Sequence, residues 1–406
     1  MKKILSLALV LVMIFSMTAA FTSCGNGETT ADENKDFKVG FFFLHDENST
    51  YDKNFIDAAN AAAEALNLSK DQVIMKVGIP EGPECQQAAE DLVDQGCDLI
   101  FADSFGHEDY MIEVAKKYPE VQFCHATGTK AHTEKLANYH NAFASIYEGR
   151  YLAGIAAGMK LNEMIEDGKI TAEQAKVGYV AAWPYAEVKS GYTSFFLGVR
   201  SVCASATMSV EYTNSWFDIA LEREAALKLI NNGCVLISQH ADSEGAPKAC
   251  EEKKVPNVAY NISTISIAPN TALISSKIDW TPYMKLIIEK TRDGKGNEIP
   301  YDWCGGIAEG SVQLTELNSK VAAEGTQAAI DAAIAQFKAG TLHVFDTSKF
   351  TVGGKKLDSY KADVDSDAKF TPDTEVVHDG YFDESADGKR SAPYFDLVID
   401  GITAAN

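Results

Sequence analysis

The chain has 406 residues, which at ~150 residues per domain favours two folded domains. Its 58 acidic and 36 basic residues give a net charge of −22. A field of that sign repels phosphate backbones and anionic lipid headgroups, which argues against nucleic-acid binding and against membrane docking through basic residues. The hydrophobic fraction of 46% is enough to build sizeable cores.

The first 23 residues have the pattern of a secretory signal, with Lys2 and Lys3 before an apolar run over 4–21. The run approaches the ~20 residues that span a bilayer, so a transmembrane anchor is the alternative. Small residues precede Cys24, and the polar, acidic stretch 24–36 reads as a flexible tether. The segment around Cys24 resembles the lipobox of bacterial lipoproteins. This implies acylation of Cys24 and an anchor on the outer side of the cell membrane.

From residue 37 onward, short β-branched or aromatic runs alternate with amphipathic helical stretches. This alternation predicts parallel sheets built of βαβ units, an α/β fold. The predicted strands are 39–44, 73–77, 98–102, 121–124, 177–181, 235–238, 257–260 and 272–275.

An internal repeat predicts two lobes of related topology. Lys38-Val39-Gly40 recurs as Lys176-Val177-Gly178, and the stretch 92–100 recurs as 229–237. Each stretch holds a Gly-Cys pair where a helix is expected to end, at a position where glycine takes a left-handed conformation.

Ligands of open parallel sheets bind beyond the carboxyl ends of the strands. The loops expected there are rich in aromatic and uncharged polar residues, which suits a flat molecule with a polar edge. These loops are 45–51, 103–106, 125–128, 182–185, 214–218 and 239–243.

Five short stretches of the sequence resemble, in the same order, those of the basic membrane lipoproteins. These proteins are the substrate-binding components of ABC transporters and have the type I periplasmic-binding-protein fold. The stretches are 102–106, 125–128, 147–154, 214–218 and 239–243. The resemblance spans about residues 37–347. It implies two Rossmann-like lobes joined by a hinge, a purine base or nucleoside as ligand, and ABC permease and ATPase subunits as partners.

The resemblance also implies domain boundaries. We expect an N-terminal lobe over 37–145 with a return segment at about 272–300, and a C-terminal lobe over 146–271 with about 301–346. Residues 347–406 are expected to form a C-terminal β extension.

Carried over by position, Tyr51 and Trp216 take the places of ring-stacking aromatics, and Phe105 lies in a turn that lines the cleft. Gln239 and Asp242 fall where the second lobe offers polar groups. The neighbouring loops add three further candidate ligand residues, namely Asp46, Asn48 and Asn214.

Two departures favour a base over a nucleoside. The nucleoside-binding branch carries a serine that is missing from Asp52-Lys53-Asn54-Phe55, and its ribose-reading aspartate has no clear counterpart in 260–263. Asp46 remains as a possible ribose acceptor.

The sequence predicts a binding protein without cofactor or metal. It contains no GxSxG, HExxH or P-loop motif, and its cysteines form no CxxC pair. Three alternatives stay open: a receptor of the same fold for a sugar or other metabolite, a sensor that presents its ligand to a partner, and a secreted nucleoside hydrolase. The hydrolase would need clustered acids or a metal to activate water.

Overall fold

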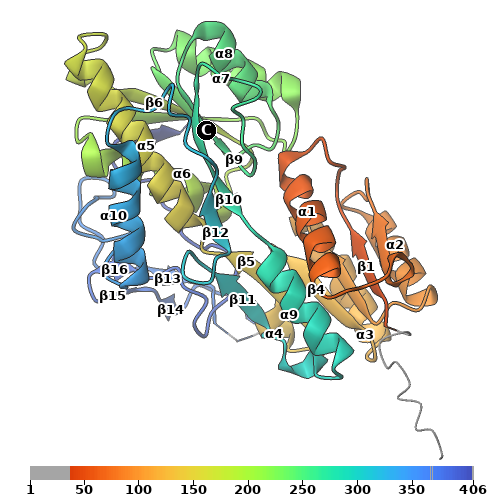
Figure 1. Ribbon diagram of the computed structural model, residues 1–406. Coiled ribbons are helices and arrows are strands. Elements are labelled where there is room, and N and C mark those ends of the chain that lie inside the picture. Colours follow the sequence, from red (N-terminus) through yellow and green to blue (C-terminus); the bar gives the residue numbers. More distant parts are fainter. Residues whose placement is uncertain (1–36, 366, 368, 405–406) are drawn as a thin grey trace, which may run out of the picture. The chain divides into compact units, whose positions relative to one another are not determined.

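The computed structural model describes residues 37–365, 367 and 369–404, and most strands in this part of the chain join two mainly parallel sheets (Figure 1). The first sheet has the order β11-β5-β4-β3-β1-β2 and is parallel throughout. Its strands are β1 Val39–Phe42, β2 Val73–Lys76, β3 Leu99–Ala102, β4 Gln122–Ala126, β5 Tyr139–Ala144 and β11 Asp302–Gly305.

The second sheet has the order β12-β10-β9-β8-β6-β7-β17, and only β12 runs antiparallel to its neighbour. Its strands are β6 Lys176–Ala181, β7 Thr207–Tyr212, β8 Leu236–Gln239, β9 Asn257–Tyr260, β10 Ala272–Ile278, β12 Val312–Leu314 and β17 Ile402–Ala404. All eight predicted strands are present, and the predicted α/β fold with parallel sheets is confirmed.

Helices cover both faces of each sheet because successive side chains of a buried strand point to opposite faces. Phe41 packs in the core beneath α1 and α9, whereas Phe42 packs in the core beneath α2 and α3. Together with its sheet, these helices form the first lobe: α1 Thr50–Ala65, α2 Pro83–Asp94, α3 Glu108–Lys117, α4 Ala131–Glu134 and α9 Thr281–Arg292.

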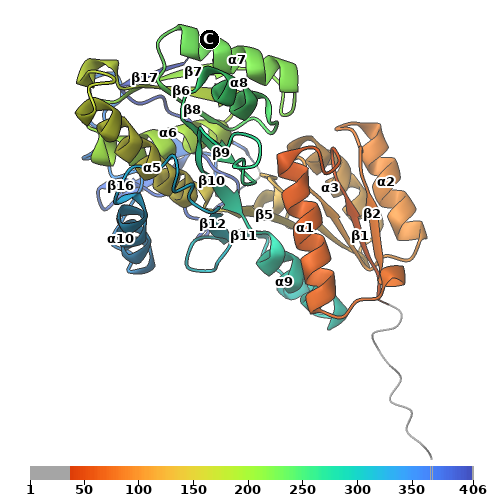
Figure 2. The ribbon, with the colours of Figure 1, turned by 45° about the horizontal axis from the view of Figure 1, so that its top comes forward.

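In the second lobe, α5, α6 and α10 cover one face of the sheet, and α7 and α8 cover the other (Figure 2). Its helices are α5 Ile146–Glu166, α6 Ala186–Val202, α7 Ile219–Asn231, α8 Gly245–Lys253 and α10 Thr326–Lys338. Short 3₁₀ turns lie at Lys70–Gln72, Phe105–His107, Ala172–Gln174 and Gly296–Glu298.

The chain passes between the sheets after β5, after β10 and after β11. The strand β10 therefore belongs to the second sheet and β11 to the first, whereas the sequence placed about 272–300 with the first lobe and about 301–346 with the second. A strand that leads out of one sheet has the same buried apolar pattern as one that ends there, so composition does not locate the crossing.

The C-terminal extension packs on the second lobe. It pairs β13 Lys361–Ala362 with β14 Thr374–Glu375, pairs β15 Val377–His378 with β16 Tyr381–Phe382, and adds β17 beside β7. Phe345, Phe382 and Phe395 join the core that α5 and α6 share. The extension is thus part of the hydrophobic core of that lobe.

Candidate functional site

A cavity lies between the two lobes, at the carboxyl ends of their strands. The first lobe lines it with Leu44, His45, Tyr51, Asp52, Ser104, Phe105 and Thr127, and the second with Glu187, Trp216, His240, Asp242 and Tyr260. Rings and polar groups therefore reach the same space from both lobes.

Tyr51 enters the cavity from the first turn of α1, which Ser49 caps by accepting a hydrogen bond from the backbone N–H of Asp52 (3.3 Å). The Tyr51 hydroxyl donates to the carbonyl oxygen of Asp103 at 2.6 Å, and its ring meets Phe55 at 4.9 Å between centroids. Burial, followed by the nearby Asp103, raises the pKa of Tyr51 well above its usual value. The phenol is therefore neutral and its ring is held in place.

Asp52 is already bonded within the first lobe. Its Oδ1 accepts the backbone N–H of His45 at 2.7 Å, and its Oδ2 lies 3.3 Å from Nδ1 of the same histidine. Burial acts to raise the pKa of Asp52, but hydrogen bonds from His45 and Ser49 outweigh it and lower the pKa. Asp52 is thus an ionised carboxylate whose two oxygens are both occupied.

Asp242 is a buried acid in the loop after β8. Its Oδ1 accepts a hydrogen bond from Asn261 Nδ2 at 3.2 Å. Burial, followed by the carboxylates of Glu222, Asp52 and Glu187, raises the pKa of Asp242 well above its usual value. Its second oxygen has no hydrogen-bond partner among the described residues, which leaves it available to a ligand.

Glu222 joins the two loops that carry Trp216 and Asp242. Both of its carboxylate oxygens lie 3.1 Å from the Ser243 backbone N–H, and Oε1 also accepts the Asp218 N–H at 3.2 Å. The Asp242 N–H in turn donates to the carbonyl of Trp216 at 2.9 Å. Burial raises the pKa of Glu222 to about 7. These bonds fix the loop that carries the Trp216 ring relative to the loop that carries Asp242.

Aromatic rings from the two lobes meet beside the cavity. Phe105 lies 5.7 Å from Tyr185 between ring centroids, and Tyr185 lies 6.1 Å from Trp216. Phe105 remains 41% exposed and Tyr185 44% exposed. Both rings are therefore partly open to solvent.

Two buried hydroxyls of the lining, Thr127 Oγ1 and Tyr260 Oη, have no hydrogen-bond partner within the described part of the chain. Buried polar groups are normally paired, so each is available to a bound molecule. Thr127 also has a left-handed backbone (φ 72°), which is rare for a β-branched residue and occurs most often at functional sites.

The structure brings four of the eight predicted ligand residues into the lining, namely Tyr51, Phe105, Trp216 and Asp242. Gln239 is buried outside it, where Nε2 donates to the carbonyl oxygens of Ala241 (2.7 Å) and Ser243 (2.9 Å).

The remaining three predicted residues are exposed and do not line the cavity. Asp46 and Asn48 bond to each other (2.8 Å between side chains), and Asn214 forms a left-handed turn at φ 55°.

Glu187, His240, Tyr260 and Thr127 were not among the predicted ligand residues. Glu187 is the second residue of α6, as Tyr51 is the second residue of α1. The internal repeat does not point to it, because its offsets of 138 (176 − 38) and 137 (229 − 92) carry Tyr51 to Lys189 or Val188.

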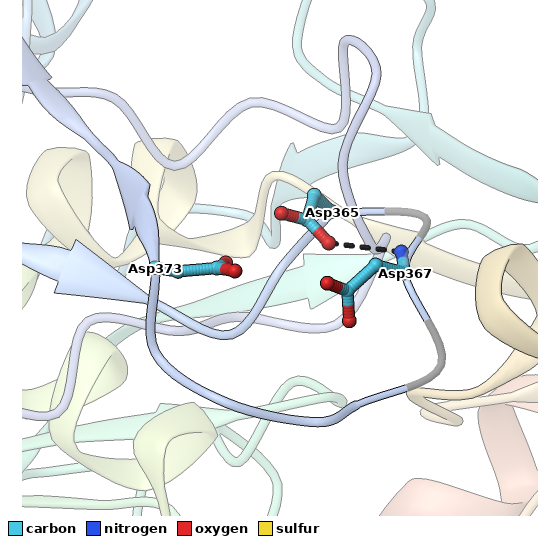
Figure 3. Close-up of side chains that lie close together, drawn as sticks. All are labelled: Asp365, Asp367 and Asp373. Atoms are coloured by element: carbon cyan, nitrogen blue, oxygen red, sulfur yellow. Dashed lines mark hydrogen bonds between the residues drawn. The ribbon is translucent and has the colours of Figure 1, made fainter.

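A separate group of acids lies in the C-terminal extension, where Asp365, Asp367 and Asp373 come close together (Figure 3). The Asp367 N–H donates to Asp365 Oδ1 at 2.9 Å, and Thr374 donates to Asp365 Oδ2 at 2.7 Å. These bonds account for the turn without an ion.

The predicted signal segment and Cys24 lie outside the described residues. Within residues 37–365, 367 and 369–404, no helix is both long enough and apolar enough to span a membrane.

Comparison with solved structures shows the same fold. An ABC transporter solute-binding protein of Aeropyrum pernix matches with a TM-score of 0.64 at 17% identity, covering 76% of this chain and 93% of that one. One from Conexibacter woesei matches with a TM-score of 0.59 at 20% identity, covering 76% and 98%.

The sequence matches the family described as ABC transporter substrate-binding protein, PnrA-like, over residues 43–339. A purine-binding protein of Brucella abortus is 30% identical over 354 residues, or 85% of this chain and 94% of that protein. An ABC transporter glucose-binding protein of Haloferax volcanii is 37% identical over 227 residues, or 56% of this chain and 54% of that protein. The chain therefore belongs to the PnrA-like family of ABC transporter substrate-binding proteins.

Proposed function

We propose that this protein captures a purine, as the free base in preference to the nucleoside, in the cavity between its lobes and delivers it to an ABC permease. The observation that carries the proposal is the lining itself: the rings of Tyr51, Phe105 and Trp216 together with the acid Asp242. Stacking contributes ~1–3 kcal/mol per base, and each edge hydrogen bond adds ~1 kcal/mol. The purine-binding relative from Brucella abortus supports the same ligand class.

Contacts across the cavity support capture by lobe closure. The N–H and hydroxyl of Thr50, on the first lobe, donate to the carbonyl of Asp242 on the second at 3.1 and 3.0 Å. Asn54 Nδ2 donates across the same boundary to Asn261 Oδ1 at 3.2 Å. A ligand that adds contacts to both lobes favours this closed arrangement over an open one.

The preference for a base rests on Asn261. A ribose presents hydroxyls that a dry cleft must pair, and carboxylates are the usual acceptors. Here the amide of Asn261 is already engaged by Asn54 and Asp242. Calorimetric titration of adenine and hypoxanthine, each beside its nucleoside, tests this. Tenfold tighter binding of the nucleosides, about 1.4 kcal/mol in their favour, would contradict it.

Ligand class is tested by thermal shift, because a molecule that binds only the folded state raises the melting temperature. Purines should raise it and pyrimidines should not. If Trp216 contacts the ligand, purine should also change tryptophan fluorescence, and Trp216→Ala should lose the response. Trp303→Phe, which lies outside the lining and packs on Tyr283, should keep it.

A sugar is the second candidate, since a relative is named as a glucose-binding protein and sugars also stack on rings. Glucose and other monosaccharides belong in the same screen. A sugar response without a purine response would replace the purine proposal.

We also propose that Cys24 is acylated and anchors the protein on the outer side of the cell membrane. Cys24→Ala should move it from the membrane fraction to the soluble fraction. An unchanged membrane fraction would favour a retained apolar helix instead.

A further inference from the structure

The cavity wall is acidic and contains no strong base. Asp52, Glu187 and Asp242 line it, and none of the lining residues is lysine or arginine. The two histidines of the lining are each bonded to an acid, His45 to Asp52 and His240 to Glu187 (3.3 and 3.2 Å). The guanidinium of Arg150 lies 3.5 Å from the centroid of the Tyr260 ring.

Of the three acids, Glu187 and Asp242 keep an oxygen for a ligand. Asp52 uses both of its oxygens on His45. The Oε1 of Glu187 lies by His240, and no other hydrogen bond to its carboxylate comes from the described residues. Carboxylate oxygens accept hydrogen bonds and cannot donate them.

The Glu187 carboxylate interacts electrostatically with two other residues of the lining, Tyr51 and Asp242. Its charge contributes to the raised pKa values of Tyr51 and Asp242, after the larger effect of burial in each. Its helix α6 begins directly after the exposed aromatic Tyr185. Glu187 thus faces residues of both lobes from the edge of the second.

We propose that Glu187 is a specificity-determining residue, whose free carboxylate oxygen makes the cavity select purines that present amino-group N–H donors and reject oxopurines and anionic purines. This inference rests on the proposed purine function and narrows its substrate class. An amino group at the purine edge donates a hydrogen bond to a carboxylate. A carbonyl group at the same position brings its oxygen against the carboxylate oxygen, and because both are acceptors no hydrogen bond forms.

Charge adds to this selection. An anion brought beside the ionised Asp52 carboxylate is repelled in a medium less polar than water, and none of the lining residues is lysine or arginine. Urate and nucleotides carry such a charge. The buried Arg150 over the Tyr260 ring offsets part of this repulsion. A site built to pair an N–H group also discriminates strongly against an analogue that lacks it, because its own acceptor is then left unpaired.

The test uses pairs of ligands that carry amino or oxo groups at the same ring positions; the oxo members also carry N–H groups on the adjacent ring nitrogens. 2,6-Diaminopurine and xanthine carry amino and oxo groups at the same two ring positions, and adenine and hypoxanthine differ at one. Titration calorimetry on the mature protein should give binding at least tenfold tighter for the amino member of each pair. Urate should be the weakest ligand.

The variant Glu187→Gln should bind 2,6-diaminopurine about tenfold more weakly, since the amide replaces one acceptor by a donor. The difference in affinity between 2,6-diaminopurine and xanthine should therefore become smaller. Glu187→Asp, which keeps the charge, should retain the preference. The control Glu84→Gln changes the second residue of α2, which is exposed and outside the lining, and should alter nothing.

Xanthine or urate binding as tightly as the aminopurines to the wild type would overturn the inference and leave the purine proposal standing. Unchanged affinities in a folded Glu187→Gln protein would do the same. If that variant fails to melt cooperatively, Glu187→Ala, which removes the acceptor altogether, provides the same comparison of paired ligands. A wild type that binds no purine overturns both.

Discussion

In the first lobe Lys38 Nζ donates to the carbonyl of Gln95 at 3.1 Å, and in the second Lys176 Nζ donates to that of Asn232 at 3.3 Å. The next residues, Gly96 and Gly233, have φ of 81° and 87°. A cysteine follows each glycine. The N–H of Cys97 donates to the carbonyl of Leu92 at 3.1 Å, and the N–H of Cys234 donates to that of Leu229 at the same distance. The repeated sequence therefore builds the same helix end twice, far from the cavity.

The lobes differ where their strands reach the cavity. The third residue after β3 is Phe105, and the third after β8 is Asp242. The second residue of α1 is Tyr51, and that of α6 is Glu187. At both positions the first lobe supplies a ring and the second an acid, although Trp216 adds a ring from the second lobe and Asp52 an acid from the first. A common frame thus carries two different chemistries.

The largest effect on stability is expected at the close crossing of α5 and α6, a contact that only the second lobe has (Figure 2). A Cβ on Gly198 would lie 2.1 Å from the Tyr151 carbonyl oxygen, and one on Gly154 would lie 2.1 Å from that of Phe195. Because backbone must move, Gly198→Val should reduce the free energy of unfolding by more than about 3 kcal/mol, measured by urea denaturation.

The control for this prediction is Ala61→Val on α1, an exposed position that introduces the same β-branched side chain into a helix of the first lobe. It should cost less than about 1 kcal/mol. Equal effects at the two positions would show that helix propensity, not the crossing, dominates.

The next prediction concerns the connection between the lobes, where Glu148 accepts the Ile307 N–H at 2.7 Å. Burial, and less strongly Glu309, raises the pKa of Glu148 from 4.5 to about 7. Between these values the folded state keeps a proton that the unfolded chain has released, so stability falls as pH rises through this window.

Glu148→Gln removes that titration. The variant should be more stable than the wild type by about 2–3 kcal/mol at pH 8, and close to it near pH 5. Thermal melts across this range measure the difference. Glu166→Gln, exposed at the end of the same helix, should follow the wild type at every pH, and a pH-independent gain in Glu148→Gln would refute the assignment.

A third prediction compares two positions of equal register in the repeat, Cys85 and Glu222. Cys85 packs in the first lobe's core, whereas Glu222 bonds the loops of Trp216 and Asp242. Glu222→Gln should weaken purine binding by about tenfold, or 1.4 kcal/mol, and shift Trp216 fluorescence. Cys85→Ala should lower the melting temperature and leave purine affinity unchanged. An equal loss of purine affinity in both variants would mean that the affinity falls because the protein is less stable, and not because the two loops have moved.

The sequence predicted the frame better than the site. Buried strands have contiguous apolar runs, and the Gly-Cys repeat marks a backbone requirement, so both are visible in one dimension. The rings Tyr51, Phe105 and Trp216 were assigned through the family resemblance, in loops whose aromatic residues are visible in the sequence. Whether a polar side chain turns towards the cavity depends on its hydrogen bonds: Gln239 turns to the backbone of its own loop, whereas Glu187, in the first turn of α6, lines the cavity.

The smallest expected effect tests the link between the lobes at the cavity. Asn54 Nδ2 reaches Asn261 Oδ1 at 3.2 Å, and Asn261 in turn donates to Asp242 at 3.2 Å. One neutral hydrogen bond contributes about 1 kcal/mol, so Asn54→Ala should weaken purine binding about fivefold. The loss should appear as faster release, because this bond holds the closed form rather than the ligand. Asn60→Ala, exposed on the same helix, supplies the control and should not change the rate. Stopped-flow release of purine, followed by Trp216 fluorescence, separates the two. A slower association with unchanged release would instead place Asn54 in the open form, where it would guide the ligand before closure.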